Sequence, residues 1–122
     1  MAKDTLEQRL SSLKDRSTLQ VTTIGRKTGK RHTVTTWFLV EGDTVYLVTL
    51  RLKRDWPRNL IKNGQVELRI DGKVFKGRAK QITNAQRLEQ VKALLTEKYW
   101  AAWFGSWFGM GPEGAFAVTL GG

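Results

Sequence analysis

The chain has 122 residues, no cysteine, and 21 lysines and arginines against 11 aspartates and glutamates, for a net charge of +10. This length fits one domain, 1–122, and the lack of cysteine excludes disulfides, zinc–thiolate sites, iron–sulfur clusters and a cysteine nucleophile. The charge favours anionic partners: phosphates, polycarboxylates, nucleic acid or an acidic membrane surface. We expect a cytoplasmic protein, because the first residues lack an apolar secretory segment and no apolar run reaches about 18 residues.

The first segment, 1–18, is predicted to contain a helix and a lead-in to the first strand. Asp4 and Glu7 have capping-box spacing, and three leucines share one face of a helix over 5–14. These leucines are Leu6, Leu10 and Leu13. We expect this face to pack against one end of a barrel. Contact with a membrane surface or a partner protein is the alternative.

The segment 19–40 is predicted to form two strands around a cationic turn. β-Branched, aromatic and aliphatic residues dominate 19–24 and 34–40, as in half-buried strands. Gly25 and Gly29 allow the chain to reverse through positive φ and leave backbone amides uncovered. The cations around them are Arg26, Lys27, Lys30 and Arg31. The pattern predicts a hairpin that binds a phosphate or carboxylate, with a solvated loop as the alternative.

The segment 41–82 is predicted to complete the barrel. After a turn at 41–43, the strand over 44–50 has two rather apolar faces, as in a barrel strand that a helix covers. A second cationic cluster follows at 51–54 and is expected to lie near the first, because loops at one end of a barrel converge. Asp55 is expected to cap a helix over 56–63 that Gly64 ends. A hairpin over 65–82 then turns at Asp71-Gly72 and exposes one basic face.

The segment 83–122 is predicted to contain a longer helix, an aromatic segment and a last strand. Thr83 and Gln86 have capping-box spacing, and apolar residues recur at helical intervals up to residue 100. Three tryptophans and two phenylalanines follow within 99–111, either as core or as a lid over a planar ligand. Residues 115–120 alternate as a strand. Together the elements predict an α+β fold, mainly β, with a small antiparallel barrel of about six strands.

Catalysis by protein side chains alone is not favoured. His32 is the sole histidine, so a two-histidine metal site cannot form, and no pair of carboxylates has a catalytic spacing. We therefore predict no metal site. The chemistry that remains is that of a bound cofactor, which the protein positions with cations and an aromatic pocket.

Three runs resemble one family in their order and separation: TTIGRKTGK, GDTVYLV and DWPRNLIKNGQVELRIDGKVFKGRA. They are similar to the deazaflavin-dependent nitroreductases and F420H2-dependent quinone reductases, and the resemblance covers 19–82. It implies a split β-barrel related to FMN-binding, pyridoxamine-phosphate-oxidase-like proteins. It also implies an enzyme in which reduced coenzyme F420 passes hydride to a quinone-like or nitro-aromatic acceptor.

The resemblance assigns residues to two parts of a site. Basic residues, their turn and the W-x-x-N-L helix are expected to hold the cofactor: Arg26, Lys27, Thr28, Gly29, Lys30, Arg31, Arg51, Trp56 and Asn59. Aromatic residues are expected to line the acceptor: Trp37, Tyr99, Trp100 and Trp103. Leu50 stands where relatives carry a small hydroxyl residue. FMN, which needs fewer cations for its single phosphate, is therefore the alternative cofactor.

Two further interpretations stay open. One is a split barrel that binds FMN, haem or another ligand without turnover, with His32 as the haem ligand. The other is a basic module for single-stranded nucleic acid, which uses cationic grooves and stacked aromatics. We rank nucleic acid below a small-molecule redox acceptor, because the aromatics cluster in one segment. No stable protein partner is implied, and a homodimer is left open.

Overall fold

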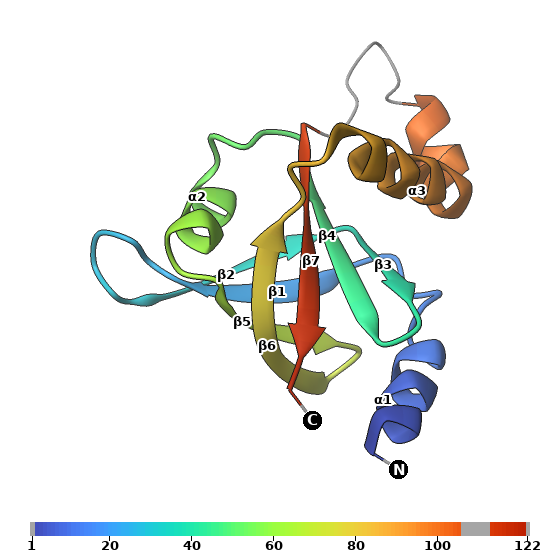
Figure 1. Cartoon of the computed structure of the whole chain (residues 1–122), viewed down its shortest axis with the longest axis horizontal. Coiled ribbons are helices and arrows are strands. Elements are labelled where there is room, and N and C mark those ends of the chain that lie inside the picture. The colour runs from blue at the N-terminus through green and yellow to red at the C-terminus, as the bar shows by residue number, and fades with distance from the viewer. Residues whose placement is uncertain (1, 106–112, 122) are drawn as a thin grey trace.

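The computed structural model describes the backbone of residues 2–105 and 113–121 and the side chains of residues 6–99 and 113–121. These residues form three helices and seven strands (Figure 1). The helices are α1 (Ala2–Ser11), α2 (Asp55–Lys62) and α3 (Ala85–Gly105). The strands are β1 (Leu19–Ile24), β2 (Arg31–Thr36), β3 (Phe38–Glu41), β4 (Thr44–Thr49), β5 (Gln65–Ile70), β6 (Lys73–Gln81) and β7 (Gly114–Leu120). The predicted α+β fold with a small antiparallel split barrel is confirmed.

All seven strands form one antiparallel sheet, in the order β2-β1-β5-β6-β7-β4-β3, which curls into a half-barrel. The edge strands β2 and β3 follow each other in the chain and are separated only by Trp37. The hydroxyl of Thr36 in β2 donates to the carbonyl of Val48 in β4 at 3.1 Å. The two ends of the sheet therefore meet near Trp37, and we call this meeting the seam.

The single strand expected over 34–40 divides at Trp37. β2 pairs with β1, from Leu19↔Thr36 to Ile24↔Arg31, whereas β3 pairs with β4 from Phe38↔Leu47 onward. One straight strand cannot pair with both partners, because β1 and β4 lie toward opposite ends of the sheet order. The division adds a strand to those predicted, and it makes Trp37 the corner at which the chain changes edges.

Two apolar clusters lie on opposite faces of β4. Val45 and Leu47 belong to the cluster inside the half-barrel, together with residues of β1, β5, β7, α1 and α2. Tyr46 and Val48 belong to the cluster under α3. Successive side chains of a strand point to opposite faces, so a strand with a core on each side reads as apolar throughout. The prediction that a helix covers the strand after residue 43 is confirmed.

The apolar face of α1 packs on the half-barrel, as predicted. Leu10 and Leu13 are buried in the inner cluster, and Leu6 packs against it. The face on which contact with a membrane surface would depend is thus occupied by the protein's own core. α1 begins at Ala2, so Asp4 lies inside the helix, and the predicted cap at Asp4 is wrong. Within the described part of the chain, no helix is long and apolar enough to span a membrane.

Two helix boundaries differ from their predicted caps. Asp55 is the first residue of α2, and the N-cap position belongs to Arg54. The cap of α3 is Asn84, whose Oδ1 accepts a hydrogen bond from the amide of Arg87 at 2.8 Å, instead of Thr83. Both errors are shifts of one residue. Neighbouring polar residues can each serve as a cap, and tertiary contacts decide between them.

Two glycines serve close packing where positive φ was expected. Only Gly29 of the first hairpin has a positive φ, 73°. A Cβ on Gly25 would lie 2.9 Å from Oγ1 of Thr28, so Gly25 is needed for a tight approach inside the turn. A Cβ on Gly64 would lie 2.6 Å from the carbonyl oxygen of Ala79, because the chain crosses β6 closely after α2. Glycine fits both positions because it has no Cβ.

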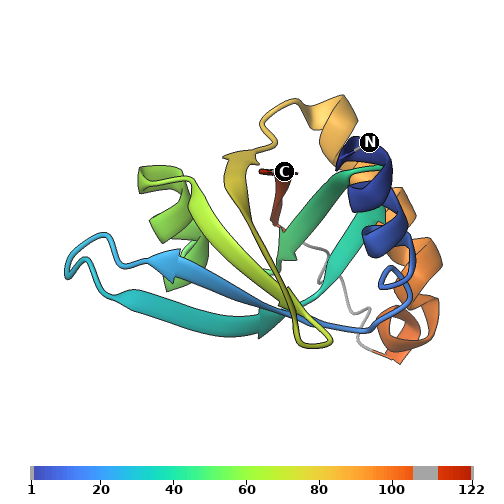
Figure 2. The ribbon, with the colours of Figure 1, turned by 90° about the horizontal axis from the view of Figure 1, so that it is seen from below.

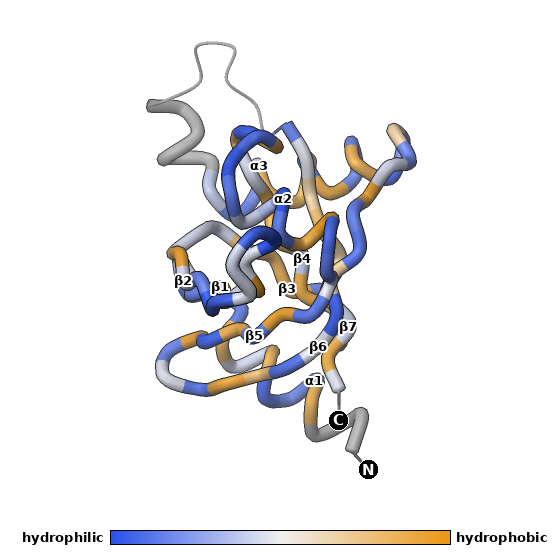
Figure 3. The backbone as a smooth tube through the Cα atoms, turned by 90° about the vertical axis from the view of Figure 1, so that its left-hand side faces the viewer, coloured by the Kyte–Doolittle hydropathy of each residue, from blue (hydrophilic) through white to orange (hydrophobic). Residues whose placement is uncertain are grey.

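The half-barrel has two different ends. The hairpin of β1 and β2 lies beside α2 at one end, and α1 and α3 lie at the other (Figures 1 and 2). Between them, buried and exposed residues alternate along β5, and hydrophobic and hydrophilic positions follow each other along its tube (Figure 3). The cations of the hairpin thus lie at the end away from α1 and α3.

Candidate functional site

A pocket of about 180 Å³ opens at the seam, between β2, β4 and the start of α2. Trp37 and Trp56 line it, and Arg54 adds a cation. The other lining residues are Thr18, Thr35, Thr36, Val48, Thr49 and Leu50. Aromatic rings combined with hydroxyls and one cation suit a flat ligand with polar edges. Trp37 and Trp56 were predicted to belong to the site. Arg54 and the threonines were not assigned to it by the sequence analysis.

Larger hollows lie elsewhere on the described surface and lack aromatic walls. One of about 500 Å³ lies beside α1 and another of about 410 Å³ lies between Asp15 and α3. A third, of about 880 Å³, follows the exposed side of β6 and the end of β7. Aromatic and apolar walls with a few polar groups are typical of small-molecule sites. The smaller pocket at the seam is therefore the better candidate.

Trp56 takes part mainly in the core. It is buried, and its ring lies 5.9 Å from that of Phe116 at a tilt of 51°. Only a small part of it can therefore contribute to the pocket. Trp37 is less buried and belongs to the rim, where the chain changes edges. A ligand in the pocket could therefore touch more of the Trp37 ring than of the Trp56 ring.

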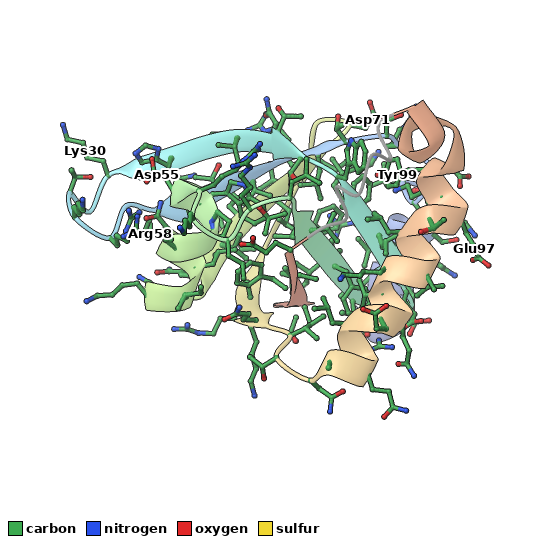
Figure 4. The ribbon with its side chains drawn as sticks, turned by 90° about the horizontal axis from the view of Figure 1, so that it is seen from above. Lys30, Asp55, Arg58, Asp71, Glu97 and Tyr99 are labelled. Atoms are coloured by element: carbon green, nitrogen blue, oxygen red, sulfur yellow. The ribbon has the colours of Figure 1, made fainter. Side chains whose placement is uncertain are left out.

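A row of exposed cations leads from the pocket along the start of α2. Arg51, Arg54 and Arg58 are exposed, and none of them forms an ion pair with another described residue. Arg54 and Arg58 are four residues apart, so they lie on one side of the helix. In Figure 4, Arg58 lies on the side of α2 that faces the first hairpin. Arg26 of the first predicted cluster also pairs with Asp55, which directly follows the second, so the two clusters are neighbours, as expected for loops at one end of a barrel.

The first hairpin is fixed to α2 by hydrogen bonds around Asn59, whose side chain is almost fully buried. Its Oδ1 accepts from the amide of Arg26 at 3.1 Å and from Nη1 of Arg26 at 2.9 Å. Its Nδ2 donates to Oγ1 of Thr23 at 3.1 Å. Nη2 of Arg26 pairs with Oδ1 of Asp55 at 3.2 Å. We call Thr23, Arg26, Asp55 and Asn59 the hairpin joint.

Several of the amides that were expected to form an anion-binding cradle in this hairpin are already bonded within the protein. The amide of Gly25 donates to the carbonyl of Lys30 at 2.7 Å, and that of Gly29 to the carbonyl of Gly25 at 2.8 Å. The amide of Lys30 donates to Oγ1 of Thr28 at 3.2 Å. Together with the amide of Arg26, four donors are already used, because a tight turn satisfies its own backbone. Thr28 and Gly29 therefore shape the turn.

The cations of the hairpin have different surroundings. The side chain of Arg26 is only 16% exposed and is held in the hairpin joint. Arg31 forms an ion pair with Glu67 at 3.0 Å. Lys27 and Lys30 are exposed and form no ion pair with another described residue. The two lysines are thus the hairpin charges that remain available to an anion.

Tyr99 supports the seam from the side of α3. The helix kinks at this residue (φ −117°, ψ 26°), and its ring stacks on Trp37 at 4.7 Å and 9°. The hydroxyl accepts from the amide of Phe38 at 3.3 Å and donates to the carbonyl of Ser17 at 2.6 Å. Burial raises the pKa of Tyr99. Two of the residues predicted to line the acceptor, Trp37 and Tyr99, are therefore in contact. Trp37 lines the seam pocket, and Tyr99 packs against Trp37 without lining the pocket itself.

Lys98 completes this arrangement and was not singled out in the sequence. Its Nζ donates to the carbonyl of Phe38 at 2.9 Å and lies 3.7 Å from the centre of the Phe38 ring. Burial lowers the pKa of Lys98 to about 8, against the opposing influence of the Asp15 charge. A single lysine in a helix gives no sequence signal for burial. We call Ser17, Trp37, Phe38, Lys98 and Tyr99 the seam joint.

Some predictions concern residues outside the described part. The side chains of Trp100 and Trp103 and the whole of 106–112 lie outside the described residues, so the role of the aromatic segment as lid or core stays a prediction.

His32 is exposed on β2. The exposed side of β6 presents Val74, Lys76, Arg78 and Lys80 and no aromatic residue, so it lacks the stacking platforms of single-strand binders.

Comparison with known proteins places these features in a family. The family model of F420H(2)-dependent quinone reductases matches residues 5–104. The chain belongs to that family. The match includes the whole seam pocket, the row of cations and both joints. No curated protein sequence matches the chain.

Solved structures agree with the fold of this quinone reductase family member. An F420-H2-dependent reductase, FDR-A, is 22% identical, with a TM-score of 0.66 and coverage of 84% of this chain and 94% of that one. A Listeria innocua protein named for pyridoxamine 5′-phosphate oxidase is 13% identical, with a TM-score of 0.72 over 100% and 95%. A structure described as a domain-swapped dimer is 22% identical, with a TM-score of 0.67 over 96% of both chains. At these identities the likeness supports the split-barrel fold.

Proposed function

We propose that the chain binds coenzyme F420 at the seam and catalyses transfer of hydride from its reduced form to a quinone-like or nitro-aromatic acceptor. The observation that carries the proposal is the seam pocket, in which Trp37 and Trp56 lie beside Arg54, within the region that matches the quinone reductase family. When bound, reduced F420 supplies the hydride. The protein's residues hold and orient the reactants.

The residues at the seam fit a flat ring system. A pocket of about 180 Å³ is smaller than the roughly 300–1,000 Å³ of pockets that enclose whole small molecules. It is suited to one face or edge of a ring, with threonine hydroxyls available to polar ring atoms. The rest of such a cofactor would extend over the surface. Trp37 would contribute to orientation, which is the main contribution a protein makes when a cofactor carries the chemistry.

Exposed cations fit the anionic end of the cofactor. Arg51 and Arg54 follow β4, and Arg54 lines the pocket. Lys27 and Lys30 extend the positive surface along the hairpin. Charged donors of this kind bind phosphate and carboxylate strongly. Arg26 was expected to bind the anion directly, but its contacts with Asn59 and Asp55 favour an indirect role. Arg54 takes its place as the principal anion ligand in this proposal.

The acceptor side is proposed to consist of Trp37 and the aromatic segment, including Trp100 and Trp103. A wall of this kind would exclude water and hold a flat acceptor against the cofactor ring. We expect Trp103→Ala to lower the rate with a quinone while cofactor affinity changes little. A loss of stability of about 3–5 kcal/mol with normal turnover would instead assign Trp103 to the core.

The deciding experiment is a titration of the purified protein with F420 and, separately, with FMN, followed by absorbance and fluorescence. We expect saturable binding of one F420 per chain, followed by quinone-dependent oxidation of reduced F420. Binding of FMN alone would favour the alternative cofactor. Binding of neither, together with tight single-stranded DNA binding that weakens steeply with salt, would overturn the proposal.

A matched pair of variants tests the site itself. Arg54→Ala should weaken F420 binding about tenfold, because one charge-assisted contact is worth about 1.5–3 kcal/mol. Arg69→Ala removes an exposed cation from β5 that does not line the seam pocket, and should leave affinity nearly unchanged. Equal losses in both variants would indicate a general effect of net charge.

The assembly state is a further part of this proposal. One structure of the same fold is described as a domain-swapped dimer, which supports a homodimer for this chain. Light scattering coupled to size exclusion should give the mass of two chains if the protein dimerises. Mass independent of concentration at the value for one chain would exclude a stable dimer.

A further inference from the structure

We propose that Asn59 is a positioning residue that fixes the cationic hairpin on α2 before an anionic ligand binds. It does so without touching the ligand, although its place in the W-x-x-N-L helix first suggested a cofactor contact. The inference rests on the proposed function in one respect: the ligand whose binding affinity should change is F420, through its anionic end.

The burial and bonding of Asn59 leave no room for a ligand contact. Its side chain is about 1% exposed, and both ends are occupied by Arg26 and Thr23. A primary amide offers two acceptor lone pairs and two donor hydrogens. Both lone pairs of Oδ1 are used by Arg26, through its backbone and its guanidinium. The amide group is therefore used for contacts between β1, the turn and α2.

The position of these contacts explains why hairpin geometry depends on them. Thr23 lies near the end of β1, and Arg26 lies in the turn that carries Lys27 and Lys30. Asn59 is thereby bonded to both sides of Gly25, the residue at which the strand passes into the turn. Figure 4 shows the hairpin that ends in Lys30 extending beside α2, with Asp55 and Arg58 between the two elements. Without the joint, the turn would be held by the pairing of β1 with β2 and β5, by its own hydrogen bonds and by the Arg31–Glu67 ion pair, none of which connects it to α2.

A fixed hairpin has a definite consequence for binding. Ordering a flexible segment costs free energy that is taken from the affinity, so a segment held in advance binds more tightly. Lys27 and Lys30 would then stand at a constant distance from Arg54 and Arg58. Arg26 also contributes, because the same guanidinium bonds to Asn59 and to Asp55 at the start of α2.

The experiment compares two variants in the joint with one outside it. Asn59→Ala removes all three contacts of the amide group, and Thr23→Val removes only the hydroxyl that orients it. Asn63→Ala is the matched control: Asn63 ends the same helix, and its Oδ1 accepts from the amide of Gln65 at 3.0 Å, away from the hairpin. Amide hydrogen exchange by NMR reports on the hairpin without any ligand, and F420 titration with steady-state rates reports on binding.

We expect Asn59→Ala to speed exchange of the Arg26 and Gly29 amides by about tenfold or more, because the joint no longer opposes local opening. It should weaken F420 binding about tenfold and raise the KM for F420, while the rate at saturation falls far less. Thr23→Val should give a smaller change of the same kind. If Asn59→Ala does not fold, Thr23→Val tests the positioning role in its place. Asn63→Ala should leave both readouts near the wild type.

Unchanged exchange of the Arg26 amide in both joint variants would overturn the positioning role, whatever the cofactor. Faster exchange with unchanged affinity would overturn its link to binding. A wild-type protein that binds no F420, with hairpin exchange still dependent on Asn59, would overturn the proposed function and leave the joint established as a structural feature. The two failures are therefore distinguishable.

Discussion

The hairpin joint and the seam joint lie at opposite ends of the half-barrel, as the positions of Asp55 and Tyr99 show (Figure 4), yet each connects a helix to the sheet through one buried polar group. In the hairpin joint, the side-chain amide of Asn59 and most of Arg26 are buried, and the neighbouring cations Lys27, Lys30, Arg54 and Arg58 are exposed. In the seam joint, the hydroxyl of Tyr99 is buried together with part of a cation, Lys98.

The difference concerns how charge is coupled to the fold. Exposed charges on the hairpin and on α2 can interact with a ligand at little cost to stability, since water screens them. A half-buried charge at the seam changes stability whenever its protonation changes. The hairpin end is therefore suited to binding anions, and the seam end to holding the shape of the pocket. Four predictions test this division, from the largest expected effect to the smallest.

Removal of the Tyr99 side chain should have the largest effect. Tyr99→Ala loses the ring that stacks on Trp37 and the hydroxyl that bonds to Phe38 and Ser17. We expect the free energy of unfolding to fall by about 3–5 kcal/mol, as for other large-to-small changes of buried aromatics. Urea denaturation followed by tryptophan fluorescence measures this. A loss below about 1 kcal/mol would show that α3 is not anchored at the kink.

Removal of the hydroxyl alone should have an intermediate effect. Tyr99→Phe keeps the stacked ring but leaves the amide of Phe38 and the carbonyl of Ser17 with a lost partner. An unsatisfied buried polar group costs about 1–3 kcal/mol, and we expect a fall in the free energy of unfolding of that size. The same denaturation experiment applies. If Tyr99→Phe and Tyr99→Ala were equally unstable, the ring would contribute nothing beyond its hydroxyl.

At the hairpin joint, Arg26→Ala should cost about 1–2 kcal/mol of stability, because it breaks a hydrogen bond to buried Asn59 as well as an exposed ion pair. Arg69→Ala is the control, since Arg69 is exposed on β5, and should stay within about 0.5 kcal/mol of the wild type. Equal stability of the two variants would mean that the Arg26 contacts contribute nothing measurable.

The smallest expected effect is a pH dependence at the seam joint. Burial lowers the pKa of Lys98 from 10.5 to about 8 in the folded chain. Between these values the unfolded chain binds more protons than the folded one, so stability should rise with pH from about 8 towards 10. Lys98→Met should lack this rise. The difference between the two proteins in denaturation midpoints at pH 7.5 and 9.5 measures it, and parallel pH profiles would exclude Lys98 as the cause.

Much of the fold could be predicted because its signals are local. Alternation along β5 and β6 and the turn at Asp71-Gly72 indicate strands and a hairpin within a few residues of sequence. The apolar character of both faces of β4 correctly indicated a covering helix. Cap positions were less predictable, since adjacent polar residues such as Thr83 and Asn84 can both accept the hydrogen bond that caps a helix.

The site was predictable in its regions and less so in its contacts. The two cationic clusters do lie next to each other, and the second reaches the seam pocket with Trp37, but Arg54 lines that pocket and Arg26 does not. No local pattern states that Asn59 will bond to Thr23, 36 residues earlier. Lys98, 60 residues from its carbonyl partner in Phe38, looks like any solvated lysine in a helix.

By itself, the sequence determined the strand and helix types, the cationic turn and the family to which the chain belongs, because periodicity, turn residues and motifs act over short distances. Only the tertiary structure decided that the chain changes sheet edges at Trp37, that the hairpin amides are used internally, and that Asn59 and Tyr99 act as joints. The physical reason is that these outcomes depend on how the whole sheet curls and which edges meet. Polar side chains then bond to the partners that the curled sheet brings within reach.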